Sequence, residues 1–211
     1  MRLIGMLDSP YVRRVAISLE MLGVPFEHEA NNEFSTFEKF QRINPVAKAP
    51  TLVCDDGDVL MDSSLILQFI EANVALGRSL WPIDSHERQR DFCVLGLALA
   101  GCDKCVQLIY ERNLRPKAAQ HAPWAERVTS QILAAYTALE QEITHRHDVF
   151  AQAQTQAAIT TAVVWRFTQS MLADVVCAEN YPQLATLSAR LEKTPAFRRY
   201  LPAGPGVPKS D

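Results

Sequence analysis

Long apolar runs are missing from this 211-residue sequence, since none approaches the ~18 consecutive residues that a membrane-spanning helix needs. The apolar opening MRLIGML is also too short for a secretory core and has no small-residue cleavage site, so it matches a buried strand better. We therefore expect a cytoplasmic protein that does not contact a membrane.

An excess of positive charge is also lacking. The 21 Lys and Arg residues are outnumbered by 24 Asp and Glu, which leaves a net charge of -3. Because nucleic acids are bound through strongly basic surfaces, a nucleic-acid partner is excluded. A hydrophobic content of 48% and a charged content of 21% are typical of a folded chain with one or two cores.

The cysteines form no disulfide framework, because their number is odd and their spacing irregular: positions 54, 93, 102, 105 and 177. This pattern favours reduced thiols. Cys102 and Cys105 form a C-x-x-C pair, but no second pair or histidine cluster completes a zinc site. A redox pair would follow the first strand, where Ser9 and Pro10 stand instead, so we expect no metal and a structural or pocket role for the cysteines.

The first third of the chain alternates between strand and helix patterns. Strands are predicted at 2–7 and 26–30, helices at 10–22 and 34–42, and a hairpin of PTLVCD and VLMD around the turn pair Asp56-Gly57. A further helix follows from Ser63. The order βαβαββα predicts an α/β thioredoxin-like domain with a mixed four-stranded sheet.

From Ser85 onward, helical periodicity replaces strand alternation. Arg115-Pro116 ends a first long helix, Pro123 opens a second, and TQAAITTAVVWRFTQSML is apolar nearly all round, as in a helix buried in a bundle. We predict a first domain at 1–76, a linker at 77–84 and an all-helical domain at 85–211.

Three short features sit where a strand meets a loop or a helix. Ser9-Pro10 opens the first helix, and Ser9 is either a plain N-cap or a hydroxyl that meets an anion such as a thiolate at the helix N-terminus. Pro50 begins a strand with either a trans or a cis bond to Ala49. Asp62-Ser63 either caps the next helix or binds an amino-acid end, carboxylate to Ser63 and ammonium to Asp62.

In order and spacing, SPYVRR, INPVAKAPTLV and LMDSSLILQFIE resemble the N-terminal domain of glutathione transferases. The closing ENYPQLATLSARLEKTPAF resembles small bacterial homologues of the serine- or cysteine-type classes. The resemblance implies that Ser9 stabilises the glutathione thiolate, that the main chain of Ala49 ahead of a cis Pro50 holds the cysteinyl backbone, and that the remaining contacts come from Asp62 and Ser63 to the γ-glutamyl end and from Lys48 to the glycyl carboxylate.

The same resemblance implies an enzyme, a homodimer, that uses glutathione as co-substrate and conjugates it to a small hydrophobic electrophile in detoxification. Along the first long helix Cys102, Val106 and Tyr110 share one face and either line the electrophile pocket or belong to the core. Tyr11 competes with Ser9 for the thiolate or joins this pocket. Alternatives are a glutathione-dependent isomerase, a thiol reductase, which would want cysteine at position 9, and a non-catalytic interaction module.

The sequence departs from the family pattern at one helix start. Family members usually open the buried helix of the second domain with a Ser/Thr-x-x-Asp capping box, whereas TQAA keeps Thr155 and has Ala158 in place of the acid. We expect the loss of one reciprocal cap, about 1 kcal/mol, which concerns folding more than chemistry.

Overall fold

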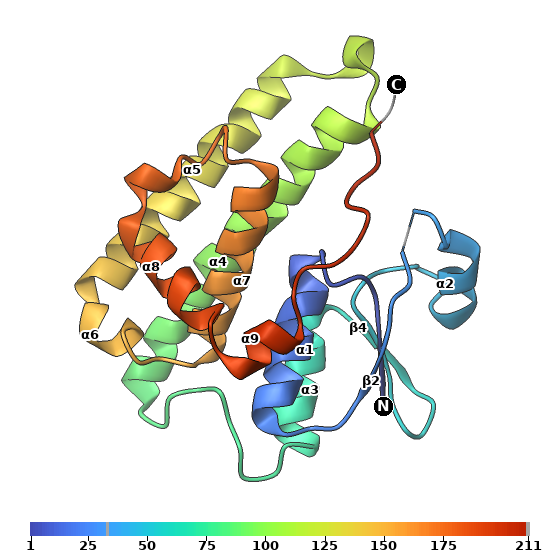
Figure 1. Cartoon of the computed structure of the whole chain (residues 1–211), viewed down its shortest axis with the longest axis vertical. Coiled ribbons are helices and arrows are strands. Elements are labelled where there is room, and N and C mark those ends of the chain that lie inside the picture. The colour runs from blue at the N-terminus through green and yellow to red at the C-terminus, as the bar shows by residue number, and fades with distance from the viewer. Residues whose placement is uncertain (33, 210–211) are drawn as a thin grey trace. The chain divides into compact units, whose positions relative to one another are not determined.

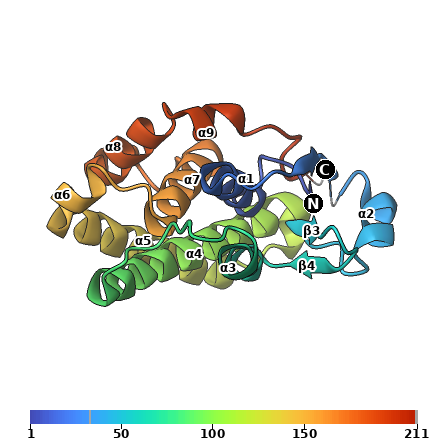
Figure 2. The same ribbon diagram turned by 90° about the horizontal axis from the view of Figure 1, so that it is seen from below.

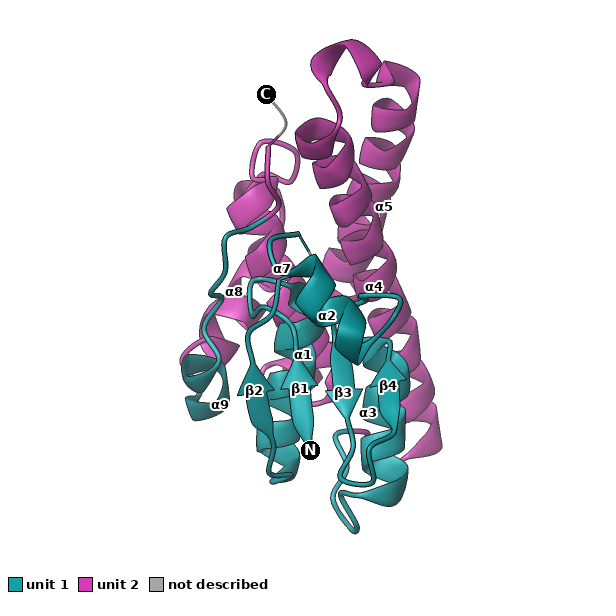
Figure 3. Cartoon of the chain, turned by 90° about the vertical axis from the view of Figure 1, so that its right-hand side faces the viewer, with its two compact units in different colours: residues 1–80, 194–206 teal, residues 81–193, 207–211 magenta. Residues whose placement is uncertain are grey.

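The structure of the protein, a computed structural model, describes residues 1–32 and 34–209. Its contacts divide the chain into two units (Figure 3). Unit 1 consists of Met1–Leu80 and Thr194–Gly206, and unit 2 consists of Trp81–Lys193 with the chain end from Val207. The division falls inside the segment 77–84 that the sequence suggests as a linker.

A four-stranded sheet forms the centre of unit 1, in the order β2-β1-β3-β4. The strands are β1 (Arg2–Ile4), β2 (Glu27–Glu29), β3 (Thr51–Val53) and β4 (Val59–Met61). β1 and β2 are parallel, whereas β3 is antiparallel to both β1 and β4. The predicted mixed thioredoxin-like sheet is thus confirmed, with strands shorter than expected.

Three of the helices of unit 1 follow the strands: α1 (Pro10–Leu22), α2 (Phe37–Ile43) and α3 (Ser63–Asn73). α1 begins with proline at its first position, where no N–H is needed, and ends at Gly23, whose φ of 67° suits glycine. α2 begins later than position 34, because the Asn32 side chain accepts bonds from the N–H groups of Phe34 and Ser35 and forms a turn there.

α1 and α3 pack against each other and against the sheet (Figure 1). Their facing side chains are fully or almost fully buried with those of β1 and β3: Leu3, Val12, Val15, Ala16, Leu19, Leu52, Ile66, Leu67 and Ile70. The apolar face of each helix therefore forms the core, and their N-termini point to the loops at one end of the strands.

Unit 2 consists of helices, as predicted. They are α4 (Ser85–Leu114), α5 (Ala122–His145), α6 (His147–Phe150), α7 (Gln156–Met171) and α8 (Pro182–Leu191), with short 3-10 turns at Lys117–Ala119 and Ala178–Asn180. α4 packs along both α5 and α7, and α7 packs on α8 (Figure 2). Nearly every side chain in the first ten residues of α7 is buried, which explains why its sequence is apolar all round.

Two helix starts in unit 2 show their caps. Asp84 accepts a hydrogen bond from the N–H of Glu87 at 2.9 Å and so caps α4. At α7, Thr155 accepts from the N–H of Ala158 at 3.4 Å, and Ala158 has no side-chain oxygen to return a bond. The cap of α7 is therefore one-sided, as the sequence predicts.

α4 is the one helix, within the described ranges, whose length and composition would also allow it to cross a membrane. Its most apolar window has a mean hydropathy of 1.7, and 44% of that window is buried. Core helices of soluble proteins have the same properties, because a buried helix and a lipid-facing helix are both apolar on several sides.

The C-terminal part of the chain differs from the predicted continuous domain at 85–211. Thr194–Gly206, including α9 (Pro195–Arg199), belongs to unit 1. The buried guanidinium of Arg13 donates its Nε–H to the carbonyl of Tyr200 at 2.7 Å, which ties this segment to α1. No local sequence pattern reveals the contact, since the partners lie 187 positions apart.

Candidate functional site

The strand register brings the three candidate loops to one edge of the sheet in unit 1. Ile4 at the end of β1 pairs with Thr51 at the start of β3, and Thr51 pairs with Met61 at the end of β4. Because Ser9 follows β1, Pro50 precedes Thr51 and Asp62 follows Met61, all three motifs leave the sheet on the same side (Figure 3).

Ser9 occupies the N-cap position of α1. Its carbonyl accepts the first helical bond, from the N–H of Arg13 at 3.0 Å, while its half-buried hydroxyl makes no capping bond to the described chain. The plain cap alternative therefore does not describe this hydroxyl. It stands at a helix N-terminus, where free N–H groups and the helix dipole stabilise an anion.

The peptide bond between Ala49 and Pro50 is cis, which confirms the second of the two alternatives for this proline. The loop lies close to the end of β1, because a Cβ placed on Gly5 would come within 3.2 Å of the Ala49 Cβ and 2.6 Å of a Val12 methyl. Gly5 has a φ of 138° and no side chain, so it permits this approach.

A buried asparagine holds the same loop in place through hydrogen bonds. Asn44 is fully buried and donates its amide to Thr51 Oγ1 at 2.8 Å, while its own Oδ1 accepts from the N–H of Val46 at 3.0 Å. The Thr51 hydroxyl in turn donates to the carbonyl of Lys48 at 2.7 Å. These bonds determine the path of the chain from the end of α2 to β3.

Asp62 has a φ of 73° and caps α3. Its Oδ1 accepts from the N–H groups of Ser64 at 2.8 Å and Leu65 at 3.3 Å. The other oxygen lies 3.9 Å from the ammonium of Lys48, and both side chains are about half exposed. The capping alternative is thus correct for one oxygen, and the second oxygen remains directed at a cation.

Arg14 completes this edge of the sheet and was not singled out from the sequence. Its side chain is buried, and its guanidinium donates to Ser63 Oγ at 3.0 Å and to Ser64 Oγ at 3.2 Å. A hydroxyl that accepts from a cation has its own hydrogen available for another acceptor. Ser63 therefore presents a donor at the N-terminus of α3, beside a buried positive charge.

The sequence of this unit matches a known family. The family model for the glutathione S-transferase N-terminal domain matches residues 3–78, which include each of these loops. Residues 3–78 therefore belong to the glutathione S-transferase N-terminal domain family. The matched range contains both the βαβ and the ββα halves of the sheet.

Solved structures of the superfamily match along almost the whole chain. A glutathione transferase family member from Pseudomonas fluorescens Pf-5, solved with bound glutathione, shares 27% sequence identity and a TM-score of 0.85 over 96% of this chain and 99% of that one. A second structure of a glutathione transferase family member from Pseudomonas fluorescens Pf-5, with bound S-(propanoic acid)-glutathione, shares 27% sequence identity. Its TM-score is 0.83 over 97% of this chain and 100% of that one.

A curated relative is similar over a shorter range. The uncharacterized GST-like protein YibF of Escherichia coli (strain K12) is 32% identical over 121 residues, which is 57% of this chain. The match spans 58% of that relative's own length. The chain therefore resembles glutathione transferases in sequence mainly over its N-terminal domain and in fold over almost its whole length.

The residues predicted for an electrophile pocket lie on two helices. Tyr11 is half-buried in the first turn of α1 in unit 1. On α4 in unit 2, Cys102 is fully buried, Val106 is partly buried and Tyr110 is 38% exposed. The core alternative describes Cys102, whereas Tyr110 remains accessible.

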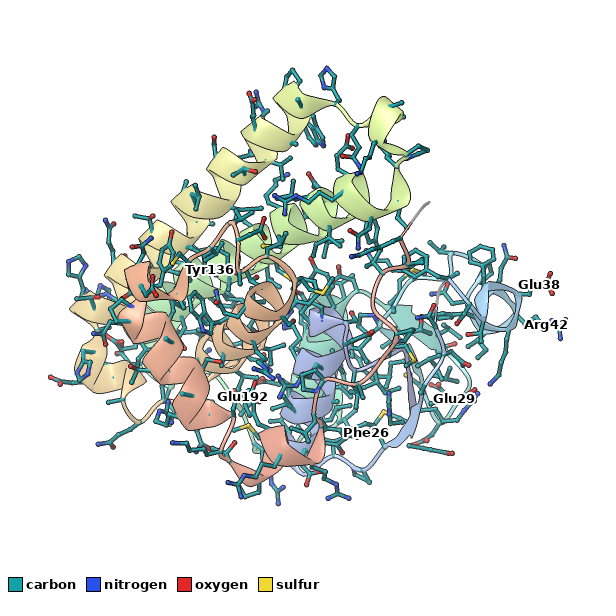
Figure 4. All side chains as sticks on the ribbon, turned by 45° about the horizontal axis from the view of Figure 1, so that its top comes forward. Phe26, Glu29, Glu38, Arg42, Tyr136 and Glu192 are labelled. Carbon is teal, nitrogen blue, oxygen red and sulfur yellow. The ribbon has the colours of Figure 1, made fainter. Side chains whose placement is uncertain are left out.

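The C-x-x-C pair lies inside α4. Both thiols are buried and neither is in a disulfide. Cys105 Sγ lies 3.4 Å from Thr168 Oγ1, which also bonds the hydroxyl of Tyr136 among the helices of unit 2 (Figure 4). Burial raises the pKa of the Cys105 thiol to about 11. The thiol is therefore protonated at neutral pH, unlike a reactive or metal-binding cysteine.

Two further features lie outside the three loops. A hollow beside α2 is lined by Phe34–Lys39 and Arg42, and the side chains of Glu38 and Arg42 extend outward from α2 (Figure 4). Across residues 1–32 and 34–209, no three His, Cys, Asp or Glu side chains gather as metal ligands would.

Proposed function

We propose that this protein is an enzyme that conjugates glutathione, as co-substrate, to small hydrophobic electrophiles. The observation that supports this most is the convergence of Ser9, the Ala49-Pro50 loop and Asp62-Ser63 at one sheet edge within the matched domain. The three groups match the three parts of a tripeptide thiol: a thiol, a peptide backbone and a free amino-acid end.

In the proposed reaction, the Ser9 hydroxyl donates a hydrogen bond to the glutathione sulfur. Together with the N-terminus of α1, this bond stabilises the thiolate and lowers the pKa of the bound thiol. The thiolate then attacks an electrophilic carbon and forms a thioether. In a substitution the leaving group departs with the displaced electron pair, and in an addition the resulting carbanion takes a proton from solvent.

The remaining residues orient glutathione in this proposal. The main chain of Ala49 pairs with the cysteinyl backbone in the manner of an added strand. Ser63, which accepts from Arg14, donates to the γ-glutamyl carboxylate, and the free oxygen of Asp62 accepts from the ammonium. Lys48 binds the glycyl carboxylate, which requires its ammonium to turn away from Asp62.

The solved relatives support the choice of ligand. The family member from Pseudomonas fluorescens binds glutathione in one structure, and another structure so described holds S-(propanoic acid)-glutathione, in which the sulfur carries an added acid group. A bound S-substituted glutathione is what a conjugating enzyme releases as product. We extend this ligand class to the present chain.

The decisive experiment replaces Ser9 by alanine. We expect kcat/KM for a nitroaromatic substrate to fall about a hundredfold, as for the loss of one preorganised donor to a developing or stabilised anion. The variant should still be retained on a column of immobilised glutathione, because the Ala49 and Ser63 contacts remain. Ser130→Ala on α5, whose hydroxyl bonds only within its own helix at Glu126, is the matched control.

Other outcomes discriminate the alternatives. Unchanged conjugation by Ser9→Ala would refute the role of Ser9. If Tyr11→Phe loses as much activity as Ser9→Ala or more, the role belongs to Tyr11. Failure of the unmodified protein to bind immobilised glutathione would favour a non-catalytic interaction module. Turnover of an isomerisation substrate without conjugation would favour the isomerase.

We also propose a cytoplasmic homodimer. None of the five cysteines is in a disulfide, which agrees with a reducing compartment. The aromatic side chains Trp81 and Phe92 stack at 4.4 Å, and Phe92 is more than half exposed on α4, as expected for a face covered by a second copy. Sedimentation equilibrium tests this, and a monomeric mass at micromolar concentration would rule the dimer out.

A further inference from the structure

The C-terminal segment of unit 1 docks on the residue immediately before Ser9. The N–H of Asp8 donates to the carbonyl of Ala203 at 3.1 Å, and the N–H of Gly206 donates to the Asp8 carboxylate at 2.8 Å. Asp8 therefore both gives and receives a bond to the same short segment, which runs past the start of α1 (Figure 1). We refer to Ala203–Gly206 as the C-terminal clasp.

The clasp fits closely against Asp8. A Cβ on Gly204 would lie 2.1 Å from Asp8 Oδ2 and 2.2 Å from its Cγ, so no other amino acid fits here without displacing the carboxylate. Asp8 is also the third residue of a turn that the N–H of Ser9 closes by donating to the carbonyl of Met6 at 3.2 Å. The clasp thus supports the turn that ends at Ser9.

A second group of contacts anchors the segment before the clasp. Arg13, one turn after Ser9, is buried and holds the carbonyl of Tyr200, whose ring stacks on Phe26 at 5.6 Å (Figure 4). Farther along α1, Glu20 accepts from Arg199 at 2.9 Å and from the Tyr200 hydroxyl at 3.2 Å. The segment before the clasp therefore contacts α1 in its first turn, at Arg13, and near its C-terminal end, at Glu20.

We propose that Asp8 is a positioning residue for the reaction and that the C-terminal clasp, through Asp8, sets where the Ser9 hydroxyl stands relative to the bound thiol. This inference rests on the proposed function, because the position of Ser9 matters only if its hydroxyl meets glutathione. Turnover responds steeply to displacements of a catalytic group by about 1 Å, so a turn held at two points by a distant segment influences the rate.

Two variants break the clasp from opposite sides. Asp8→Ala removes the acceptor for the N–H of Gly206, and Gly204→Ala pushes a methyl group into the Asp8 carboxylate. We expect each to lower kcat about tenfold or more and to move the pH profile of kcat/KM toward alkaline pH, with a smaller change in KM for glutathione. Asp8→Asn, which keeps an acceptor oxygen, should restore most of the rate.

Arg199→Ala is the matched control. It also removes a contact of the C-terminal segment with α1, but at Glu20 instead of Asp8. We expect it to keep the parent pH profile and kcat. Parent-like kinetics in both Asp8→Ala and Gly204→Ala, or an equal loss in Arg199→Ala, would overturn the inference.

Hydrogen exchange separates failure of this inference from failure of the proposed function. The Asp8 and Ser9 amides are both bonded, so in Gly204→Ala we expect them to exchange faster while the amides of Val15 to Leu19 in α1 stay protected. If the parent protein does not conjugate glutathione, the proposed function fails although this faster exchange is still seen. Unchanged exchange at Asp8 and Ser9 would refute the clasp whatever the activity.

Discussion

The two units place their buried polar groups differently. In unit 1, Arg14 and Asn44 are buried at one sheet edge. Arg14 bonds Ser63 and Ser64 at the start of α3, and Asn44 bonds Val46 and Thr51 on either side of the Ala49-Pro50 bond. In unit 2, the buried polar groups bond one another between helices, as Tyr136 and Cys105 do through Thr168. Buried polar groups therefore shape a surface in unit 1 and fasten a core in unit 2.

This difference predicts that the stability of unit 2 and glutathione binding by unit 1 can be impaired separately. Changes in the core of unit 2 should lower the free energy of unfolding and leave glutathione affinity intact. Changes beneath the loops of unit 1 should lower affinity or rate for a smaller cost in stability. The predictions below test this separation, in order of expected effect.

Trp165→Ala should have the largest effect on stability. Trp165 is buried on α7 and makes edge contacts with Tyr136 and Tyr181 at 5.9 Å. Loss of the ring leaves a cavity, which costs about 3–5 kcal/mol in urea unfolding. Trp124→Ala, at a position 40% exposed, is the control. Loss of glutathione binding at a temperature where Trp165→Ala remains folded would contradict the separation.

Arg146→Met should destabilise unit 2 by about 3 kcal/mol, because it leaves the buried Asp91 carboxylate without its cation. Arg146 also bonds Glu87 at 2.7 Å. The double variant Asp91→Leu with Arg146→Met should recover much of the loss, since no isolated charge remains. Arg90→Met removes an exposed partner of Glu87 and should change the unfolding midpoint little.

Cys105 should make the stability of unit 2 fall at alkaline pH. Burial raises the thiol pKa from 9.0 to about 11, so the unfolded chain loses this proton before the folded one does. The stabilising contribution is complete below pH 9 and is lost as the pH rises toward 11, by about 2 kcal/mol. The free energies of unfolding of the parent and of Cys105→Ala, plotted against pH, should converge over this range. Parallel plots would show that burial of the thiol is not the cause.

Arg14→Met tests the polar support in unit 1. Without the guanidinium, the hydroxyls of Ser63 and Ser64 lose their donor, and we expect glutathione affinity to fall about tenfold, or about 1.4 kcal/mol. Titration calorimetry measures this, with Arg2→Met, which removes an exposed pair with Glu29, as the control. Ser63→Ala should reproduce the loss if the cation acts through this hydroxyl.

Asn44→Ala should have the smallest effect. It removes the bonds to Thr51 and Val46, which costs about 1 kcal/mol in stability and loosens the Ala49-Pro50 loop. The KM for glutathione should rise while kcat changes less, because the loop orients the peptide and does not touch the sulfur. A fall in kcat with an unchanged KM would show that the loop affects the chemical step and not the binding of the glutathione backbone.

Several features of the site were predictable from the sequence because their causes are local. Pro10 and Gly23 mark the limits of α1 through backbone preferences, and Asp62 caps α3 by accepting from the N–H groups of Ser64 and Leu65. The order of strands and helices follows from hydrophobic periodicity together with the residues that form turns and helix ends. The three motifs were therefore recognisable, although whether each residue caps a helix or faces a ligand was left open.

Other features were not predictable because their partners are distant in the chain. Arg14 meets Ser63 across 49 positions, and the clasp meets Asp8 across 198. Arg13 and Arg14 are consecutive in the sequence, but helical spacing does not predict that Arg14 contacts α3 and that Arg13 contacts the C-terminal segment. Charged residues are usually exposed, so burial of both was contrary to expectation.

By itself the sequence determined the elements, their order and the superfamily, since these depend on periodicity, on proline and glycine conformations, and on motifs read along the chain. The tertiary structure alone decided that the C-terminal segment returns to unit 1 and that the Ser9 hydroxyl makes no capping bond to the described chain, and it confirmed the cis Ala49-Pro50 bond that the family resemblance implies. These outcomes depend on which groups meet after folding, and packing between distant segments decides that.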